Sequence, residues 1–150
     1  MKISFDIDDT LTANNAFSLE RQSALQRILG VEQIRLGTKE LFKELRKRGH
    51  KIWIYTTSFR SVTKIRFMFF SYGIPVDEII NQQIHVKTIK KFNLTISKYP
   101  SAFGIDLHID DSPGVGIEGE LHGFKTIIVS VNDQNWVNTV LQEIQKMSNV

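Results

Sequence analysis

The feature that most constrains the fold is an alternation of short apolar runs with longer segments whose apolar side chains recur at helical spacing. The runs expected to form strands are 2–7, 51–55, 78–81, 105–109 and 125–131. The segments expected to form helices are 18–29, 38–48, 61–72 and 134–147. Strands that alternate with helices predict an α/β fold with a central parallel sheet, because parallel strands need a crossover connection. Residues 82–100 have no clear assignment.

The length and composition set limits on the class of protein. With 150 residues the chain suits one domain over 1–150. No cysteine is present, which excludes a disulfide framework, a thiolate metal site and a cysteine nucleophile. No apolar run approaches the ~20 residues that span a bilayer, and Asp6 interrupts the apolar start too early for a secretory signal. We therefore expect a soluble, cytoplasmic protein with no membrane partner.

The net charge of +3 is unevenly distributed along the chain. Residues 39–98 carry 13 basic and four acidic side chains, whereas the segments on either side are net acidic. A basic segment attracts anionic substrates or nucleic acid. Most of these lysines and arginines are expected on solvated helix faces, and no motif supports nucleic-acid binding.

Acidic side chains follow two of the expected strands. Ligands of open parallel sheets bind beyond the carboxyl ends of the strands, so polar residues at those ends matter most. If the first and fourth strands are neighbours, five carboxylates converge on one edge: Asp6, Asp8, Asp9, Asp110 and Asp111. Five anions repel one another strongly, and a hard divalent cation with oxygen ligands, Mg²⁺ first of all, would offset that repulsion. Helix capping, as expected for Asp133, explains a single aspartate better than two clusters.

One run of residues resembles a known motif: Phe5-Asp6-Ile7-Asp8-Asp9-Thr10-Leu11-Thr12. It is similar to motif I of the haloacid dehalogenase-like (HAD) phosphohydrolase superfamily, Asp-x-Asp-x-Thr-Leu after a hydrophobic strand. The later order also follows that superfamily, with Thr56 ending the next strand and a lysine preceding the pair Asp110-Asp111. The resemblance spans almost the whole chain. It implies a single Rossmann-like, three-layer HAD-type catalytic domain.

The resemblance also implies roles for the acidic residues. Asp6 would be the nucleophile that forms an aspartyl-phosphate, and a carboxylate needs no base to activate it near pH 7. Asp8 would be the general acid/base. The implied metal ligands are Asp6, the backbone carbonyl of Asp8, and Asp111. Asp110 would be a further ligand, or would hold a water or the lysine.

Donors must surround the oxygens of a transferring phosphoryl group. Thr56 would supply its hydroxyl and a nearby backbone N–H, and Thr57 and Ser58 are alternatives in an uncertain register. Thr10 is expected to steady the loop and Asp8, or to make a local turn bond. Arg60 would either orient an anionic substrate or face solvent at the start of a helix.

The lysine of the implied site has four candidates. Lys98 is favoured because it is nearest to the fourth strand. The alternatives have the pattern of an exposed helical face: Lys87, Lys90 and Lys91. The four histidines lack metal-ligand spacing and are interpreted as structural: His50, His85, His108 and His122. The glycines at 114–119 do not follow the first strand, which argues against a dinucleotide site.

The short chain leaves no room for a sizeable cap domain in either of the intervals where HAD enzymes carry one. We therefore expect a capless or minimally capped domain. An open site suits a large substrate such as a phosphoprotein or a nucleic-acid end. It also suits closure by a neighbouring subunit, which makes a homo-oligomer an alternative.

The favoured function is a Mg²⁺-dependent phosphomonoester hydrolase acting on a phosphorylated small molecule or an exposed phosphate of a macromolecule. A phosphotransferase would use the same phosphoenzyme with another acceptor. A receiver-type signalling module is the alternative from another class. Its phosphorylated aspartate ends the third strand, and no aspartate follows residues 78–81 in that place.

Overall fold

A computed structural model describes residues 1–12 and 15–148 of the chain. Five strands form one sheet, in which every neighbouring pair is parallel. They are β1 (Lys2–Phe5), β2 (Lys51–Tyr55), β3 (Glu78–Ile80), β4 (Leu107–Asp110) and β5 (Thr126–Ile128). Their order across the sheet is β3-β2-β1-β4-β5, so β1 and β4 are neighbours at its centre. This arrangement confirms the predicted α/β fold.

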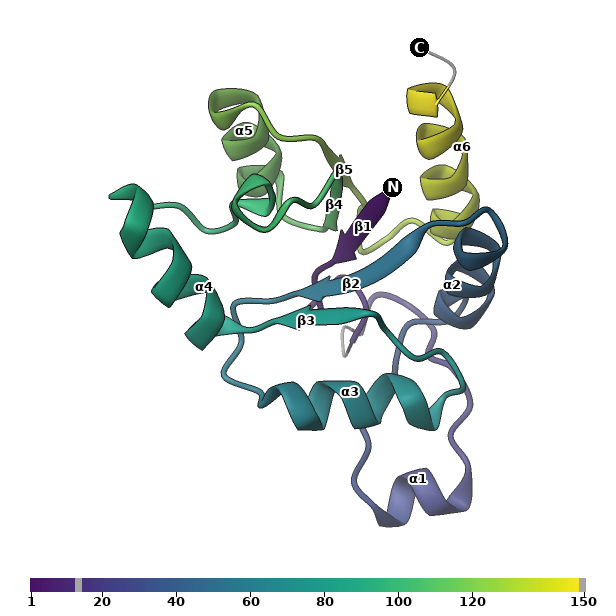
Figure 1. The fold of residues 1–150 in the computed structure, drawn as a ribbon. Helices are drawn as coiled ribbons and strands as arrows, with labels where there is room; N and C mark the ends of the chain where they lie inside the picture. Colours follow the sequence, from purple (N-terminus) through teal and green to yellow (C-terminus); the bar gives the residue numbers. More distant parts are fainter. Residues whose placement is uncertain (13–14, 149–150) are drawn as a thin grey trace.

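Helices cover both faces of the sheet. The longer ones are α2 (Thr38–Lys47), α3 (Val62–Ser71), α4 (Gln82–Ile89), α5 (Pro113–His122) and α6 (Trp136–Ser148). Figure 1 shows α2, α3 and α6 on one side and α4 and α5 on the other, which makes three layers. Right-handed crossovers explain this division, because the chain first winds outward toward β3 and then back toward β5.

The core lies mainly between the sheet and the layer that contains α2 and α3. The β1 residue Phe5 packs on Phe42 of α2 with ring centroids 4.8 Å apart, and Phe42 stacks on Phe69 of α3 at 5.8 Å. Strand β1 is fully buried from Ile3 to Phe5, as expected for a central strand covered on both faces. A rigid central strand therefore leads directly into the loop that begins at Asp6.

The largest difference from the predicted elements lies in residues 18–29. Only α1 (Ala24–Ile28) is helical there, and it begins at a capping box formed by Ser23 and Gln26. The preceding residues are extended because they pair with another segment: Glu20 N–H donates to the Ile34 carbonyl at 2.7 Å, and Leu19 pairs antiparallel with Arg35. Three apolar side chains of the expected helix are exposed, namely Leu25, Ile28 and Leu29.

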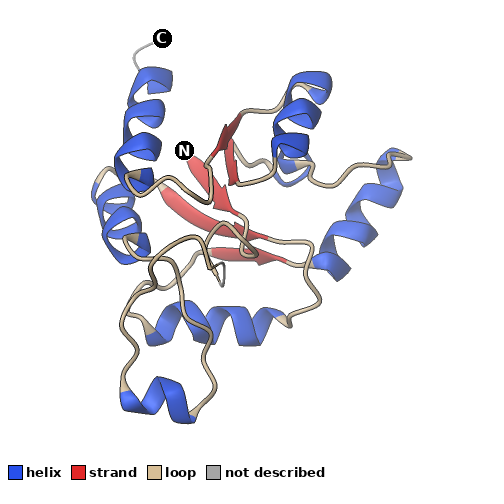
Figure 2. Ribbon diagram, turned by 180° about the vertical axis from the view of Figure 1, so that it is seen from behind, coloured by secondary structure: helices blue, strands red, loops and turns tan. Residues whose placement is uncertain are grey.

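Between β1 and α2, the described residues contain one helix or strand, the short helix α1. Figure 1 shows α1 beyond α3, on the far side from the sheet, and Figure 2 shows the same loop from behind. Gln26 ties it to the end of α3 by donating to the Ser71 carbonyl at 3.1 Å. The chain thus has no sizeable cap, as predicted.

Two stretches without a predicted element are ordered. Residues 82–100 form α4, a 3₁₀ turn at Lys90–Phe92, and the start of another at Pro100–Phe103. Helix α5 occupies a glycine-rich stretch that shows little helical periodicity. Small residues face β5 there: a Cβ on Gly119 would lie 2.9 Å from the Phe124 carbonyl oxygen. Within the described residues no helix is long and apolar enough to cross a membrane.

Candidate active site

The central strands bring acidic side chains together at their carboxyl ends. Phe5 of β1 pairs with Ile109 of β4, and the N–H of Asp6 donates to the Ile109 carbonyl at 2.9 Å. One carboxylate oxygen each of Asp6, Asp110 and Asp111 lies within 4.8 Å of the other two. We call these three residues the acidic cluster. Asp6 and Asp110 are buried and Asp111 is partly buried, so their mutual repulsion is weakly screened.

A buried lysine faces this cluster. The ammonium of Lys98, a residue only 3% exposed, donates to the Asp6 carboxylate and to the Tyr55 carbonyl, the latter at 3.1 Å. It also lies 3.7 Å from a carboxylate oxygen of Asp110. The other three candidates, Lys87, Lys90 and Lys91, are exposed. Of the four lysines, Lys98 is the one that the structure places against Asp6.

The backbone around Lys98 is held by α5. The carboxylate of Glu118 accepts from the N–H of Ser97 at 2.9 Å and from the N–H of Lys98 at 3.3 Å. On the other side, Tyr99 N–H donates to the Tyr55 hydroxyl at 2.9 Å. Glu118 was not among the predicted site residues, because its helix has no clear periodicity and lies 20 residues further along the chain.

Burial and charge move the pKa values of the cluster in different directions. Burial raises the pKa of Asp6 to about 6, and the Lys98 ammonium opposes that rise. Burial alone would raise the pKa of Asp110, but the hydrogen bond from His108 and the charge of Lys98 lower it overall. Burial, with the charge of Asp110, raises the pKa of Asp111. The cluster thus holds three carboxylates, and one ammonium contacts two of them, an imbalance of charge that a bound cation would relieve.

The buried His108 supports Asp110. Its Nε2 lies 3.0 Å from the Asp110 carboxylate and its Nδ1 lies 2.8 Å from the Ser4 hydroxyl. Because a carboxylate only accepts, Nε2 donates, and burial lowers the pKa of His108, which favours the ring with a single proton. Nδ1 therefore accepts from Ser4. A histidine that uses both nitrogens in this way is structural, in line with the sequence interpretation.

The two threonines lie beside the cluster in different roles. Thr56 is buried, its N–H donates to the Ile80 carbonyl at 2.9 Å, and its hydroxyl accepts from the N–H of Ser58 at 3.1 Å. The hydroxyl of Thr10 donates to Asp111 at 2.8 Å. Thr10 therefore steadies Asp111, whereas the sequence predicted that it would steady Asp8. Thr56 therefore shapes the loop after β2, and Thr10 links the loop after β1 to β4.

The Asp8 carboxylate is not part of the acidic cluster. Its side chain is 52% exposed, and both of its oxygens accept from the Arg60 guanidinium, at 3.0 and 2.8 Å. Arg60 also donates two hydrogen bonds of 2.8 Å to Glu32. These bonds to Glu32 and Asp8 raise the pKa of Arg60 above its ordinary value. The metal contact that the resemblance implies for Asp8 is its backbone carbonyl and does not involve this side chain.

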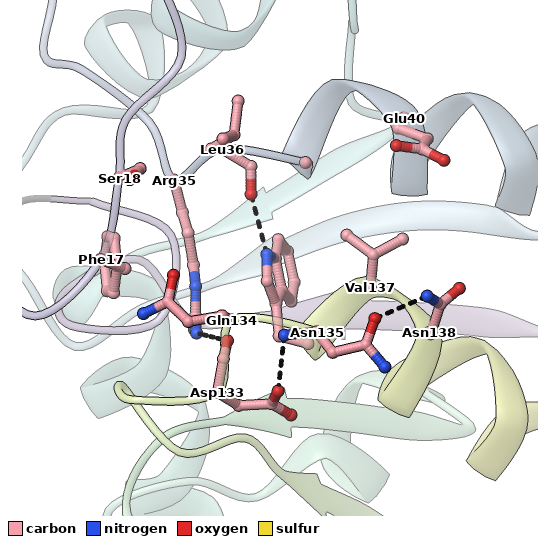
Figure 3. Close-up of a pocket in the computed structure, with 12 residues that line it drawn as sticks. Phe17, Ser18, Arg35, Leu36, Glu40, Asp133, Gln134, Asn135, Val137 and Asn138 are labelled. Carbon is pink, nitrogen blue, oxygen red and sulfur yellow. Dashed lines mark hydrogen bonds between the residues drawn. The ribbon is translucent and has the colours of Figure 1, made fainter.

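A separate cavity of about 240 Å³ contains none of the cluster residues (Figure 3). Its wall includes Arg35, which is buried between the rings of Phe17 and Trp136, with its guanidinium carbon 4.4 and 4.8 Å from their centroids. Arg35 donates to the carbonyls of Ser130 and Asp133 at 3.1 and 2.8 Å. This buried cation braces the loop before α6, and sequence reasoning did not single it out.

The comparisons with known proteins support the fold. The sequence matches no protein-family model and no curated protein. A HAD-superfamily hydrolase of subfamily IA, variant 1, from Geobacter sulfurreducens matches with a TM-score of 0.54 and 13% identity, covering 85% of this chain and 88% of that one. A protein from Thermotoga maritima described as a putative β-phosphoglucomutase matches with a TM-score of 0.52 and 12% identity, covering 96% and 100%.

A third similar structure was solved with a ligand. It is a mutant of CbbY from Rhodobacter sphaeroides in complex with xylulose-1,5-bisphosphate, with a TM-score of 0.51 and 13% identity over 86% of this chain and 85% of that one. At such low identity these likenesses concern the fold alone. The chain has a Rossmann-like core similar in fold to that of the HAD-superfamily hydrolase from Geobacter sulfurreducens, with an acidic cluster at the carboxyl edge of its sheet.

Proposed function

We propose that residues 1–150 form one catalytic domain, a Mg²⁺-dependent phosphomonoester hydrolase that acts through an aspartyl-phosphate on Asp6. The observation that carries the proposal is the placement of Asp6 at the end of the central strand, in contact with Lys98 and within the acidic cluster. A carboxylate with a pKa of about 6 is ionised at neutral pH and can attack without a base.

The proposed reaction has two steps. In the first, an Asp6 oxygen forms a bond to phosphorus, the bond to the leaving oxygen breaks, and Asp8 donates a proton to that oxygen. In the second, Asp8 takes a proton from water, the water oxygen bonds to phosphorus, and the Asp6 carboxylate is released with inorganic phosphate. The Lys98 ammonium, the Thr56 hydroxyl and the backbone N–H of Thr57 would stabilise negative charge on the phosphoryl oxygens.

The acidic cluster fits a hard divalent cation. Three carboxylates with one ammonium leave an excess of negative charge, and oxygen ligands are those that Mg²⁺ prefers. Asp6, Asp110, Asp111 and the backbone carbonyl of Asp8 would hold the ion. When bound, it would neutralise charge on the phosphoryl group.

Two observations bear on the substrate class, and they favour different candidates. The CbbY mutant binds a sugar bisphosphate, which favours a phosphorylated small molecule as the substrate of this chain too. An exposed phosphate on a macromolecule is the alternative, because an open site admits a large substrate.

The strand order argues against a receiver-type module. Receiver domains of the flavodoxin-like kind have the order 2-1-3-4-5, whereas this sheet has the order β3-β2-β1-β4-β5. The putative β-phosphoglucomutase among the neighbours keeps phosphotransfer as the second candidate. Analysis of products in the presence of glucose or glycerol separates the two, since a transferase yields a phosphorylated alcohol.

The testing experiment measures phosphate release from a panel of phosphomonoesters by the wild type and by Asp6→Asn. We expect release with Mg²⁺, none with a chelator, and a loss of at least about 1000-fold in Asp6→Asn, because the nucleophile is removed.

The matched control is Asp106→Asn, which changes an aspartate at the opposite edge of the sheet, where it accepts from the N–H of Lys2. It should keep wild-type activity. Equal activity of Asp6→Asn and wild type, or no release from any substrate, would overturn the proposal.

A further inference from the structure

We propose that Arg60 and Glu32 form a clamp that positions the Asp8 carboxylate for proton transfer, an inference that rests on the proposed function. The clamp consists of these two residues, neither of which belongs to the acidic cluster. Arg60 is a positioning residue that acts through Asp8, and Glu32 anchors Arg60.

The contacts of Arg60 define a single geometry. Its Nη1 and Nη2 donate to the two oxygens of Asp8, while Nε and Nη2 donate to the two oxygens of Glu32. A planar guanidinium that binds two carboxylates through two pairs of bonds has little freedom to rotate. The orientation of Asp8 is therefore set by a fork that Glu32 holds from the other side.

Both members of the clamp are fixed to the rest of the fold. The carbonyl of Arg60 accepts from the side-chain amide of the buried Asn81 at 3.1 Å, at the end of β3. The carbonyl of Glu32 accepts from the Tyr72 hydroxyl at 3.2 Å, just after α3. The Arg60 side chain is only 19% exposed, so water competes weakly for its donors. The clamp therefore joins the loop after β1, the loop after β2 and the short α1 segment.

The position of Asp8 suits the proton that the proposed reaction needs. In-line displacement puts the leaving oxygen opposite the attacking one. Asp6 is buried and would attack from inside, so the acid has to stand on the solvent side, where Asp8 is half exposed. By holding the Asp8 carboxylate outward, the clamp also keeps it out of the acidic cluster.

The second anchor explains how the clamp works during turnover. Asp8 must free one oxygen to give or take a proton. Because Arg60 keeps both of its bonds to Glu32, it stays in place while Asp8 releases one bond. A lone arginine on an exposed loop would instead follow Asp8 or turn into solvent.

The test compares two substrates that differ in their need for an acid. An alkyl phosphate such as glycerol phosphate releases an alkoxide that must be protonated, whereas 4-nitrophenyl phosphate releases a stable phenolate. We expect Arg60→Gln to lower kcat/KM for the alkyl ester by about 30- to 100-fold, and for the aryl ester by less than about 3-fold.

Further variants keep the test informative if Arg60→Gln folds poorly. Glu32→Gln should show the same selectivity with a smaller loss, about 3- to 10-fold on the alkyl ester, since Arg60 keeps Asp8 but loses part of its anchor. Arg60→Lys should not restore the alkyl rate, because an ammonium lacks the planar fork. Asp8→Asn should show the largest selective loss.

The matched control is Arg66→Gln, the same change on α3 at a side chain that contacts Val76 and Glu78 instead of Asp8. It should leave both rates unchanged. Equal losses on both esters in Arg60→Gln would show a merely structural role for Arg60. A faster reaction with the alkyl ester would show that Arg60 restrains Asp8. Either result would overturn the clamp and leave the proposed function standing. No hydrolysis of any phosphomonoester of the panel by the wild type would overturn the proposed function and the clamp with it.

Discussion

At the scale of single residues, the decisive feature is a buried ammonium among carboxylates. Lys98 contacts Asp6, lies near Asp110, and has almost no exposed surface. A buried ion pair adds little net stability compared with apolar residues, but the loss of one partner leaves the other charge without compensation. Lys98 should therefore matter for the stability of the metal-free protein as well as for the proposed reaction.

Lys98→Met tests this dependence. Removing the ammonium leaves two buried carboxylates facing each other, so we expect the free energy of unfolding to fall by about 3–5 kcal/mol. Urea denaturation without divalent cations measures the change. The control Lys91→Met alters an exposed lysine and should change stability by less than about 0.5 kcal/mol. A Lys98→Met protein as stable as the wild type would contradict this account of the pair.

At the scale of elements, α5 shows how close packing can replace helix propensity. The helix contains three glycines, which are poor helix formers, yet it lies against β5 and carries Glu118, which holds the backbone at Lys98. Gly119 permits the approach, since a Cβ there would meet the Phe124 carbonyl oxygen at 2.9 Å and the Thr126 side chain at 3.1 Å. The position of α5 on the sheet thus depends on a missing side chain.

We expect Gly119→Ala to destabilise the protein by about 1–3 kcal/mol, because backbone atoms of the loop must shift to admit the methyl group. The matched change Gly114→Ala lies in the same helix, where the nearest atom to a Cβ is the Ser112 hydroxyl at 3.4 Å. It should be neutral or stabilising by up to about 1 kcal/mol, as alanine favours helix. Thermal unfolding of both proteins decides the question; a Gly119→Ala variant more stable than Gly114→Ala would refute the packing argument.

At the scale of the whole molecule, buried histidines link stability to pH. Burial lowers the pKa of His85, whose Nδ1 lies 2.6 Å from the Tyr55 hydroxyl. The unfolded chain then binds a proton more readily than the folded one as the pH falls below about 6.5. His85 therefore contributes stability that is present above that pH and lost below it. The raised pKa of Asp6 acts in the opposite sense, because the folded state takes up its proton first.

A comparison with His85→Gln isolates the histidine, since the contribution of Asp6 is common to both proteins. Between pH 7.5 and 5.5 we expect the wild type to lose more stability than the variant, because its unfolded chain takes up a proton on His85 that the folded state resists. Urea denaturation at several pH values measures this difference. The exposed His122 is the control, and His122→Gln should follow the wild type. Parallel curves for the wild type and His85→Gln would contradict the prediction.

The amino-acid sequence alone determined the α/β class, the strands and most of the long helices, because hydrophobic periodicity is a local property of the chain. It also indicated that five carboxylates converge on one edge, since parallel strands present their carboxyl ends there. In the structure Asp6, Asp110 and Asp111 form the acidic cluster, whereas the Asp8 side chain binds Arg60. Among four lysines the sequence favoured Lys98 by position alone.

Only the tertiary structure decided the contacts that depend on packing between distant segments. Residues 18–20 pair with 34–36 in place of a helix because backbone groups there find partners across the loop. Glu118 reaches Lys98, and Arg60 joins Asp8 to Glu32, across separations of 20 or more residues. Local sequence patterns do not predict such contacts, because they depend on how the layers pack and not on neighbouring residues in the chain.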